Sequence, residues 1–373
     1  MIIACPREIK AQEFRVGLTP YSTSVLVDDG HEVWIESTAG AGIGCADDDY
    51  LAAGARIVDT AAELFDRAEL VIKVKEPQAE ERKLLKPDQI LFTYLHLASD
   101  AKQTSDLLES GSICIAYETV TDAQGRLPLL MPMSAIAGRL AVQAAAGHLE
   151  KHQGGMGVLL SGAPGVDAES VTIIGAGVVG SNACRIALGL GASVTVLDRS
   201  EKALADLQSR YSGTLNCVIS TPESIEEYVS RSALVVGAVL IPGGRADHLI
   251  SSALVKKMRP GSVIADVAID QGGCCENSRP TTHKEPTFII DEVIHYCVAN
   301  IPGAVPRTAS KSLNSATLPF IRELANKGLA PALRDNRHLL GGLNVCRGLM
   351  TQEEVAEDLG LDYVPAAEAL AKL

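Results

Sequence analysis

The feature of this chain that most constrains its fold is a run of spaced glycines between an apolar segment and a segment of small residues. Residues 171–174 are β-branched and mostly apolar, which is typical of a strand buried on both faces. Gly175, Gly177 and Gly180 follow with the spacing G-x-G-x-x-G, and small apolar residues continue over 178–190. Strand, glycine turn and helix in this order predict a dinucleotide-binding unit, whereas the glycine spacing alone would also fit a packing turn.

Each of these glycines has its own expected task. Gly175 permits the tight turn from strand to helix, Gly177 lets the backbone approach a pyrophosphate, and Gly180 lets helix and strand pack closely. The N–H groups at the helix N-terminus are then available to the phosphates. All three glycines are therefore candidate cofactor residues.

An acidic residue at the end of the next predicted strand bears on the choice of dinucleotide. The strand, residues 193–197, ends at Asp198, near the position at which such units carry an acid for the adenosine ribose. A carboxylate there accepts hydrogen bonds from the ribose hydroxyls and repels a 2′-phosphate. Arg199 follows directly and weakens the preference, because an arginine can pair with a phosphate. We expect NAD as the cofactor.

The composition limits the classes of protein to which the chain can belong. Its 373 residues suffice for two domains, and its net charge of −13 argues against binding to nucleic acid or to an anionic membrane surface. No apolar run approaches the ~20 residues of a membrane helix, and the N-terminus lacks the basic start of a signal peptide. Nine cysteines without a C-x-x-C pair indicate reduced, buried thiols, so we expect a cytoplasmic protein without a metal site.

Short apolar runs alternate with helical patterns along most of the chain, which predicts an α/β protein of two doubly wound Rossmann-like domains. The dinucleotide-binding domain, residues 129–308, is expected to be inserted into a discontinuous outer domain made of 1–128 and 309–373. A crossing helix over 134–152, capped by Ser134, is expected to lead from the first domain to the second. The outer domain carries no phosphate-binding fingerprint, so we expect it to bring the substrate to the nicotinamide.

Three polar residues of the outer domain lie where the chain leaves predicted strands. Arg15 follows the first strand, Lys75 follows residues 70–74, and His96 follows residues 90–94. The carboxyl ends of parallel strands are where open α/β sheets bind ligands. Arginine suits a carboxylate, lysine can polarise a carbonyl and histidine can transfer protons near neutral pH. Taken singly, each also has a structural explanation, and Arg15 in particular could pair with a neighbouring glutamate.

Two polar residues of the dinucleotide domain lie in apolar surroundings. Asp270 ends an apolar strand and precedes a glycine pair, so it could position a water or the histidine, or it could cap the turn before Gly272. Asn300 lies between apolar residues of the segment 298–303. His31, His283 and His295 have no partner at metal-ligand spacing and are expected to be structural.

These residues and the strings around them resemble the alanine dehydrogenase family. The similarity extends over nearly the whole chain in the same order. The matching strings are residues 7–10 with 13–20, 74–77, 94–98, 175–180, 267–273 and 295–307. The same family includes the dinucleotide-binding portion of the proton-translocating nicotinamide nucleotide transhydrogenase, which shares fold and ancestry.

The resemblance implies reversible oxidative deamination of L-alanine to pyruvate and ammonia with NAD. It implies that Arg15 holds the substrate carboxylate and that Lys75 holds the carboxylate and the carbonyl oxygen. It also implies that His96 is the acid/base and that Asp270 is a second catalytic residue, which orders water or the imine. Residues expected to border the substrate also include Met133 and Asn300. The implied cofactor contacts are Ser134, Gly175, Gly177, Val178, Val179, Gly180, Asp198, Ser220, Val239, Leu240, Val267, Ala268, Ile269, Asp270, Arg279, Val298, Ala299, Asn300 and Ile301.

The resemblance further implies a homohexamer, since family members usually assemble in this way. Some members carry a histidine that, with the acid matching Glu323, has been assigned to magnesium. Lys327 replaces that histidine here, and lysine is a poor metal ligand, so we expect no such metal.

Three other interpretations fit parts of the sequence. A transhydrogenase component would act with a membrane partner, whereas a free-standing dehydrogenase would reduce NAD with L-alanine alone. A non-catalytic NAD sensor would bind the cofactor without turnover. An amino-acid dehydrogenase of other specificity, such as a lysine- or saccharopine-type enzyme, would share the architecture.

Overall fold

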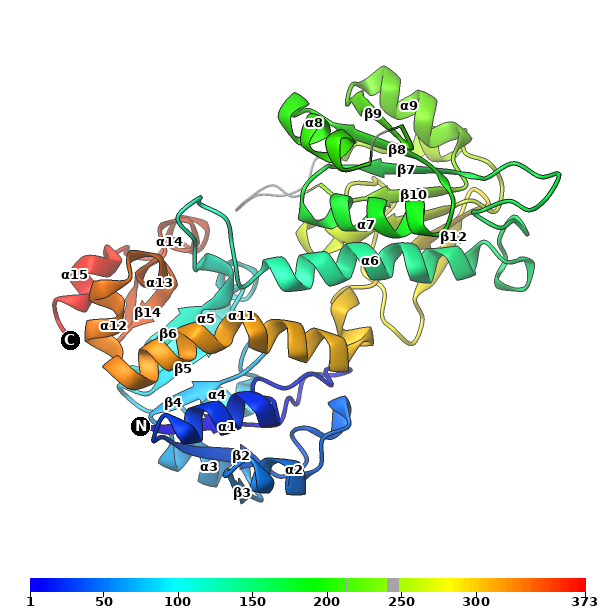
Figure 1. Ribbon diagram of the computed structural model, residues 1–373. Helices are drawn as coiled ribbons and strands as arrows, with labels where there is room; N and C mark the ends of the chain where they lie inside the picture. The colour runs from blue at the N-terminus through cyan, green and yellow to red at the C-terminus, as the bar shows by residue number, and fades with distance from the viewer. Residues whose placement is uncertain (212, 240–247) are drawn as a thin grey trace. The chain divides into compact units, whose positions relative to one another are not determined.

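The computed structural model describes residues 1–211, 213–239 and 248–373. The chain divides into two compact units (Figure 1). Unit 1 consists of Met1–Pro132 and Val305–Leu373, and unit 2 of Met133–Ala304. No helix in the described ranges is both long and apolar enough to cross a membrane.

Unit 1 is built on a mainly parallel sheet in the order β15-β14-β6-β5-β4-β1-β2-β3. Only β14 runs antiparallel to its neighbours β6 and β15. Most of its strands are apolar runs buried along their length, as expected for a sheet covered on both faces. The strands are β1 (Ile2–Cys5), β2 (Glu32–Glu36), β3 (Arg56–Val58), β4 (Leu70–Ile72), β5 (Ile90–Thr93), β6 (Ile113–Ala116), β14 (Leu343–Cys346) and β15 (Leu349–Met350).

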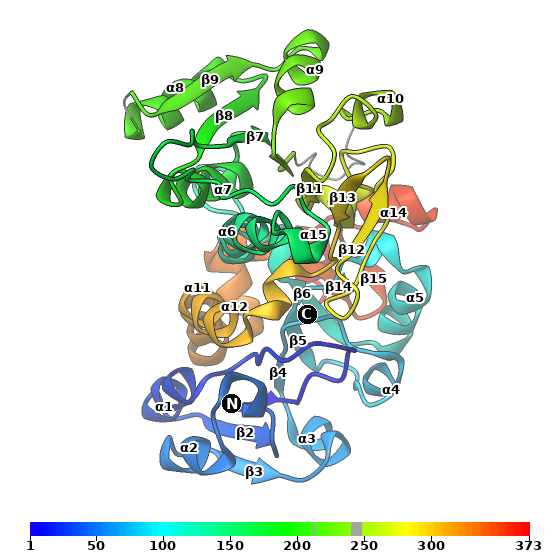
Figure 2. The ribbon, with the colours of Figure 1, turned by 90° about the vertical axis from the view of Figure 1, so that its right-hand side faces the viewer.

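Helices lie on both sides of this sheet, with α1 and α11 on one side and α3, α4 and α5 on the other (Figure 2). Side-chain caps start several of them: Thr19 begins α1, Thr60 begins α3 and Asp100 begins α5, each accepting a hydrogen bond from a backbone N–H of the first turn. The helices are α1 (Pro20–Asp28), α2 (Asp47–Ala52), α3 (Ala61–Arg67), α4 (Ala79–Arg82), α5 (Ala101–Ser110), α11 (Pro306–Lys327), α12 (Leu329–Asp335), α13 (Arg337–Leu340), α14 (Glu353–Leu359) and α15 (Ala366–Leu370).

In unit 2 the described strands form a sheet in the order β12-β13-β11-β10-β7-β8-β9. All neighbours are parallel except β12 and β13, which form an antiparallel hairpin. The order reverses at β7, so the carboxyl ends of β7 and β10 form a topological switch point. The strands are β7 (Ser170–Ile174), β8 (Ser193–Asp198), β9 (Leu215–Ile219), β10 (Leu234–Gly237), β11 (Val263–Asp266), β12 (Thr287–Ile290) and β13 (Val293–Tyr296).

The helices of unit 2 also lie on both sides of their sheet, with α7 and α8 on one side and α9 and α10 on the other (Figure 2). Helix α7 packs against both β7 and β8. Ser200 and Thr221 cap α8 and α9. The helices are α6 (Met131–His148), α7 (Val178–Gly189), α8 (Glu201–Arg210), α9 (Pro222–Arg231) and α10 (Ser252–Val255).

The expected fold class, two doubly wound Rossmann-like domains, is confirmed by these two sheets. The expectation for the crossing helix was wrong at both ends, because α6 spans Met131–His148 rather than 134–152. Pro132 fits the first turn of a helix, where its missing N–H is not needed. Ser134 therefore lies inside the first turn and is not the N-cap.

Candidate active site

The glycine turn of unit 2 has the geometry that its spacing predicts. Gly175 has φ +109°, a conformation that side chains rarely adopt, and its N–H donates to the carbonyl of Leu197 at 2.7 Å. A Cβ on Gly180 would lie 1.7 Å from the carbonyl oxygen of Gly175. Gly177 is the N-cap of α7 with φ −69°, and a Cβ there would have no atom within 4 Å. Two of the glycines are thus required by the fold, whereas Gly177 leaves space at the helix N-terminus.

Asp198 ends β8 and lies against this turn. Its Oδ2 accepts a hydrogen bond from the N–H of Ala176 at 2.6 Å, and its Oδ1 accepts one from the N–H of Ser200 at 2.7 Å. The carboxylate therefore holds the glycine turn in place. It also places a negative charge next to the N-terminus of α7, where a dinucleotide-binding unit needs its ribose acceptor.

Most other predicted cofactor residues also follow strand ends of unit 2. Val178 and Val179 form the first turn of α7, and Ser220 follows β9, where its N–H donates to the carbonyl of Asp198. Val239 follows β10, whereas Leu240 lies outside the described residues. Val267, Ala268, Ile269 and Asp270 form the 3₁₀ helix η5 (Val267–Gln271) directly after β11. The fold thus brings these segments to one edge of the sheet.

The other candidates of unit 2 lie on α6 and within residues 270–301. Asp270 is exposed on η5. Asn300 has φ +60°, and its carbonyl lies 3.1 Å from Nε2 of His283. The Arg279 guanidinium lies 4.5 Å from the centre of the Phe288 ring. The other members of the set are Ser134 and Met133 on α6, Val298 and Ala299 after β13, and Ile301 at the start of the 3₁₀ helix η6 (Ile301–Ala304).

A buried carboxylate that the sequence analysis did not single out organises the η5 loop. Asp266 is fully buried at the end of β11. Its Oδ1 accepts from the N–H of Ala268 at 3.1 Å, and its Oδ2 accepts from the N–H groups of Cys274 and Cys275 and from the Ser278 hydroxyl. It therefore ties both ends of the segment that carries Asp270. Its position at a strand end is its one sequence signal, and that signal does not distinguish a buried acid from a solvated one.

In unit 1, Arg15 forms a buried ion pair with Glu13, as one of the sequence alternatives anticipated. Nε and Nη2 of Arg15 bond the two carboxylate oxygens at 2.7 Å and 2.5 Å, and Arg15 is only 2% exposed. Burial acts to lower the pKa of the guanidinium, but the hydrogen bond and charge of Glu13 outweigh it, so the net pKa is raised. Arg15 is a fixed cation.

The loop that carries Arg15 is fastened to α11. The N–H of Val16 donates to Oγ of Ser310 at 3.0 Å, and the N–H of Thr19 donates to Oδ1 of Asn314 at 2.8 Å. Both helix residues are buried. These bonds to buried side chains hold the backbone that follows Arg15.

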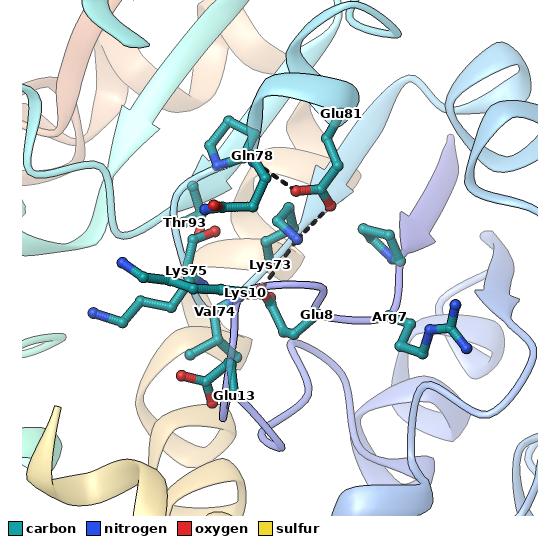
Figure 3. A network of polar contacts seen from close by, with 12 residues as sticks. Arg7, Glu8, Lys10, Glu13, Lys73, Val74, Lys75, Gln78, Glu81 and Thr93 are labelled. Carbon is teal, nitrogen blue, oxygen red and sulfur yellow. Dashed lines mark hydrogen bonds and ion pairs between the residues drawn. The ribbon is translucent and has the colours of Figure 1, made fainter. Parts of the chain in front are cut away.

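Lys75 lies beyond the end of β4, in a turn whose backbone is hydrogen-bonded to the side chains of Glu8 and Thr93. Its N–H donates to Oε1 of Glu8 at 3.3 Å, and its carbonyl accepts from Oγ1 of Thr93 at 3.0 Å. The next residue, Glu76, pairs with Lys10 across the turn. Figure 3 shows Lys75, Glu8, Thr93 and Lys10 around the end of β4.

His96 is held in a left-handed conformation beyond the end of β5. Its φ is +51°, and its N–H donates to Oε1 of Glu118 at 2.6 Å. The N–H of Leu95 donates to the same carboxylate at 3.0 Å. The imidazole stacks on Tyr94 with a centroid distance of 5.9 Å, and its Nδ1 lies 3.8 Å from Oε1 of Glu118. Glu118, like Asp266, is an acid after a strand that the sequence analysis missed.

Two further features of unit 1, a cavity and a lysine at the end of α11, do not bring the three predicted substrate residues together. A cavity of about 330 Å³ has Arg15 and Glu13 in its lining, but not Lys75 or His96, so it does not join the three predicted substrate residues. Lys327 bonds Glu323 at 3.1 Å and Asp335 at 3.0 Å. The Lys327 ammonium therefore bridges two carboxylates. The described ranges contain no cluster of three or more metal-ligating side chains.

Comparison with known proteins identifies the family of the chain. Residues 4–137 match the model of the N-terminal domain of "Alanine dehydrogenase/PNT", and residues 141–353 match that of its C-terminal domain. The alanine dehydrogenase of Halomonas elongata is 56% identical over 370 residues, which cover 99% of this chain and 100% of the relative. A solved L-alanine dehydrogenase has a TM-score of 0.94 at 49% identity and covers 96% of this chain and 99% of its own.

A more distant match concerns the fold alone. A transhydrogenase from Sinorhizobium meliloti has a TM-score of 0.81 at 23% identity, covering 95% of this chain and 99% of its own. The family implies a nicotinamide dinucleotide as cofactor, and the open glycine turn of unit 2 fits one. The chain therefore belongs to the alanine dehydrogenase/PNT family of oxidoreductases.

Proposed function

We propose that the protein is an NAD-dependent L-alanine dehydrogenase that catalyses the reversible oxidative deamination of L-alanine to pyruvate and ammonia. The observation that carries the proposal is the 56% identity over the full length of a curated alanine dehydrogenase. The glycine turn of unit 2 and the three polar strand ends of unit 1 supply the parts that such a reaction needs.

The preference for NAD over NADP rests on Asp198. Its carboxylate lies beside the glycine turn, bonded to the N–H of Ala176, and it would repel a 2′-phosphate. Gly177 and the first turn of α7 would take the pyrophosphate, since the space at Gly177 is open. Arg199 is exposed next to Asp198 and is the residue that could accommodate NADP, so both dinucleotides belong in the test.

In unit 1, Arg15 and Lys75 would bind the substrate. Glu13 holds the Arg15 guanidinium through Nε and Nη2, so the substrate carboxylate would share the cation with Glu13. Lys75 would hold the carboxylate and, in the reverse direction, the carbonyl oxygen of pyruvate. Fixing these groups orients Cα, and orientation is among the largest contributions available to such a reaction.

His96 and Asp270 would handle the protons. The chemistry that the dinucleotide supplies when bound is acceptance of the hydride from the alanine Cα. His96 would take the proton from the water that adds to the resulting iminium, and Glu118, 3.8 Å from Nδ1, would stabilise the imidazolium. Asp270, exposed on η5, would order that water, and collapse of the carbinolamine would release pyruvate and ammonia.

The test is a substrate panel with the purified protein. We expect L-alanine with NAD to yield reduced nicotinamide absorbance without any added partner, and pyruvate with ammonia to consume it. Glycine, L-serine, L-lysine and saccharopine are the competing substrates, and NADP is the competing cofactor. Cofactor binding with no turnover of any amino acid would contradict the proposal, as would faster turnover of another substrate.

We also propose that the protein is a cytoplasmic homohexamer. The compartment is supported by nine cysteines that all remain free thiols, since disulfides are rare in reducing compartments. The hexamer rests on family resemblance. Light scattering on the purified protein tests it, and a monomeric mass would refute it.

A further inference from the structure

We propose that a buried charge triad of Glu8, Lys73 and Glu81 positions Lys75 and so controls recognition of the substrate carboxylate. The inference rests on the proposed function, since it assigns a role within the same site. It names residues that do not touch the substrate themselves. They act through the backbone that carries Lys75.

The triad lies beside the turn that carries Lys75 (Figure 3). Nζ of Lys73 bonds Oε2 of Glu8 at 3.1 Å and Oε1 of Glu81 at 2.7 Å. The exposed fractions of the three side chains are 0% for Lys73, 2% for Glu8 and 3% for Glu81. Burial alone would lower the pKa of Lys73, but the two carboxylates raise it above its ordinary value. Lys73 is therefore a permanent cation at the centre.

The second oxygen of each carboxylate bonds the backbone of the turn. Oε1 of Glu8 accepts the N–H of Val74 at 2.7 Å and the N–H of Lys75 at 3.3 Å. Oε2 of Glu81 accepts the N–H of Gln78 at 2.7 Å. Glu8 thus fixes the backbone of Lys75, which would bind substrate. Glu81 fixes the backbone of Gln78, where α4 begins.

The charges of the triad indicate that Glu8 does more than neutralise Lys73. Lys73 and Glu81 alone would form a neutral buried pair, so Glu8 adds a net negative charge where charges are costly to bury. Burial raises the pKa of Glu8, in keeping with that cost. A carboxylate kept at such a site is explained by the two N–H groups that it accepts, because a charged acceptor makes stronger hydrogen bonds than a neutral one.

Glu8 also links the two predicted substrate cations. It lies on the loop between β1 and α1, seven residues before Arg15, and its charge adds to the larger effect of Glu13 in raising the pKa of Arg15. The same loop is joined to the Lys75 turn a second time by the surface pair of Lys10 with Glu76. The buried contact through Glu8 is the one shielded from solvent and salt, so it sets the spacing between the two cations.

The test compares Glu8→Ala with Glu8→Gln in the full-length enzyme. Both variants keep the Lys73–Glu81 pair, but only glutamine retains an oxygen that can accept the two N–H groups. For Glu8→Ala we expect the KM for L-alanine to rise about tenfold, kcat to fall less, and the Kd for NAD to stay within about twofold. Glu8→Gln should restore most of the KM. Lys102→Met, which removes an exposed lysine of α5, is the control and should match the wild type.

A second measurement separates positioning from general stability. In Glu8→Ala, amide hydrogen exchange should accelerate in the peptide that spans residues 73–78 and not across unit 1 as a whole. If Glu8→Ala does not fold, the same alanine–glutamine comparison is made with Lys73→Met and Glu81→Gln also present, a background with no charge left in the triad. An unchanged KM in the alanine variant, or equal KM values for alanine and glutamine at position 8, would overturn the inference.

Failure of this inference is distinguishable from failure of the proposed function. If the wild type does not oxidise L-alanine with NAD, the proposed function is wrong. If the wild type is active and only the Glu8 comparison fails, the function stands and the triad is structural.

Discussion

His96, which follows β5 in unit 1, is held in a backbone conformation that residues other than glycine rarely adopt. His96 adopts φ +51° without being glycine, a conformation that costs free energy unless its surroundings enforce it. The Glu118 carboxylate enforces it, because it accepts the N–H groups of both Leu95 and His96. Strain maintained at one exposed imidazole is consistent with a catalytic group whose direction matters.

We expect His96→Ala to lower kcat about 100-fold or more, which is typical of a lost acid/base group. The Kd for NAD should change less than about twofold, because His96 belongs to unit 1 and the glycine turn to unit 2. Steady-state kinetics and a dinucleotide titration measure the two quantities. His152→Ala, which removes an exposed histidine of unit 2, serves as the control. Normal turnover in His96→Ala would remove this residue from the mechanism.

A substitution that removes only the charge of Asp198 tests whether this residue selects NAD over NADP. We expect Asp198→Asn to lower the ratio of the Kd for NADP to the Kd for NAD about tenfold, because the charge that repels a 2′-phosphate is lost. Fluorescence titration with both reduced dinucleotides gives the ratio. Asp206→Asn, on the exposed side of α8, should leave it unchanged. An unaltered ratio in Asp198→Asn would assign the preference to another group.

In the turn between β7 and α7, Gly180 is needed for the fold, whereas Gly177 is expected to be needed for dinucleotide binding. We expect Gly180→Ala to destabilise unit 2, because its Cβ would lie 1.7 Å from the Gly175 carbonyl oxygen. Gly177→Ala should fold normally, since its φ of −69° suits alanine and no atom lies within 4 Å of the new methyl group.

The same pair of variants should differ in cofactor binding. In Gly177→Ala the methyl group would occupy space left for a pyrophosphate, so we expect the Kd for NAD to rise about tenfold or more, with an unchanged melting temperature. Thermal unfolding and isothermal titration measure the two effects. Equal NAD affinity in Gly177→Ala and the wild type would place the pyrophosphate elsewhere.

The elements that the sequence predicted well are those with strong apolar periodicity. The strands expected over residues 90–94, 171–174 and 193–197 differ by one residue each from β5, β7 and β8. The hairpin of β12 and β13 is hard to recognise in the sequence, because its turn at Asp291 and Glu292, both at positive φ, lacks the usual asparagine–glycine signal. The three-residue edge strand β3 carries too short a pattern to recognise.

The residues of the candidate site also divide into those that the sequence could identify and those that it could not. Its glycines and cations could be named from the sequence, because they stand at strand ends. Their supports could not, because Glu8, Asp266 and Glu118 act by accepting backbone N–H groups from segments that only the fold brings near. A single acid after a strand looks the same in sequence whether it is solvated or buried.

At the scale of the whole molecule, the two units have separate cores and can be followed by separate signals. The one tryptophan of the chain, Trp34, is 8% exposed on β2 of unit 1, so its fluorescence reports the unfolding of that unit. Far-UV circular dichroism reports both units. A change confined to unit 2 should therefore appear in the dichroism and not in the fluorescence.

His295 predicts such a change with acid. It is fully buried on β13, stacked on Phe288 with centroids 5.0 Å apart, and neither ring nitrogen has a hydrogen-bond partner within the described part of the chain. Burial lowers the pKa of its imidazole from 6.5 to about 4. Between these two values the unfolded chain binds a proton that the folded unit does not bind, so the free energy of unfolding falls as the pH is lowered through this window.

We expect the stability of unit 2 to decrease by about 2 kcal/mol between pH 7 and pH 5 through His295 alone. His295→Leu removes the titrating group, so it should lose correspondingly less stability over that range, whereas His152→Leu, an exposed histidine of the same unit, should behave as the wild type. Urea unfolding at both pH values, read by dichroism and by Trp34 fluorescence, measures the effect. The His295 difference should be present in the dichroism transition and absent from the fluorescence transition, because only the unfolding of unit 2 exposes His295 to protonation. Equal pH dependence in His295→Leu and the wild type would mean that the imidazole finds a proton acceptor in the folded protein.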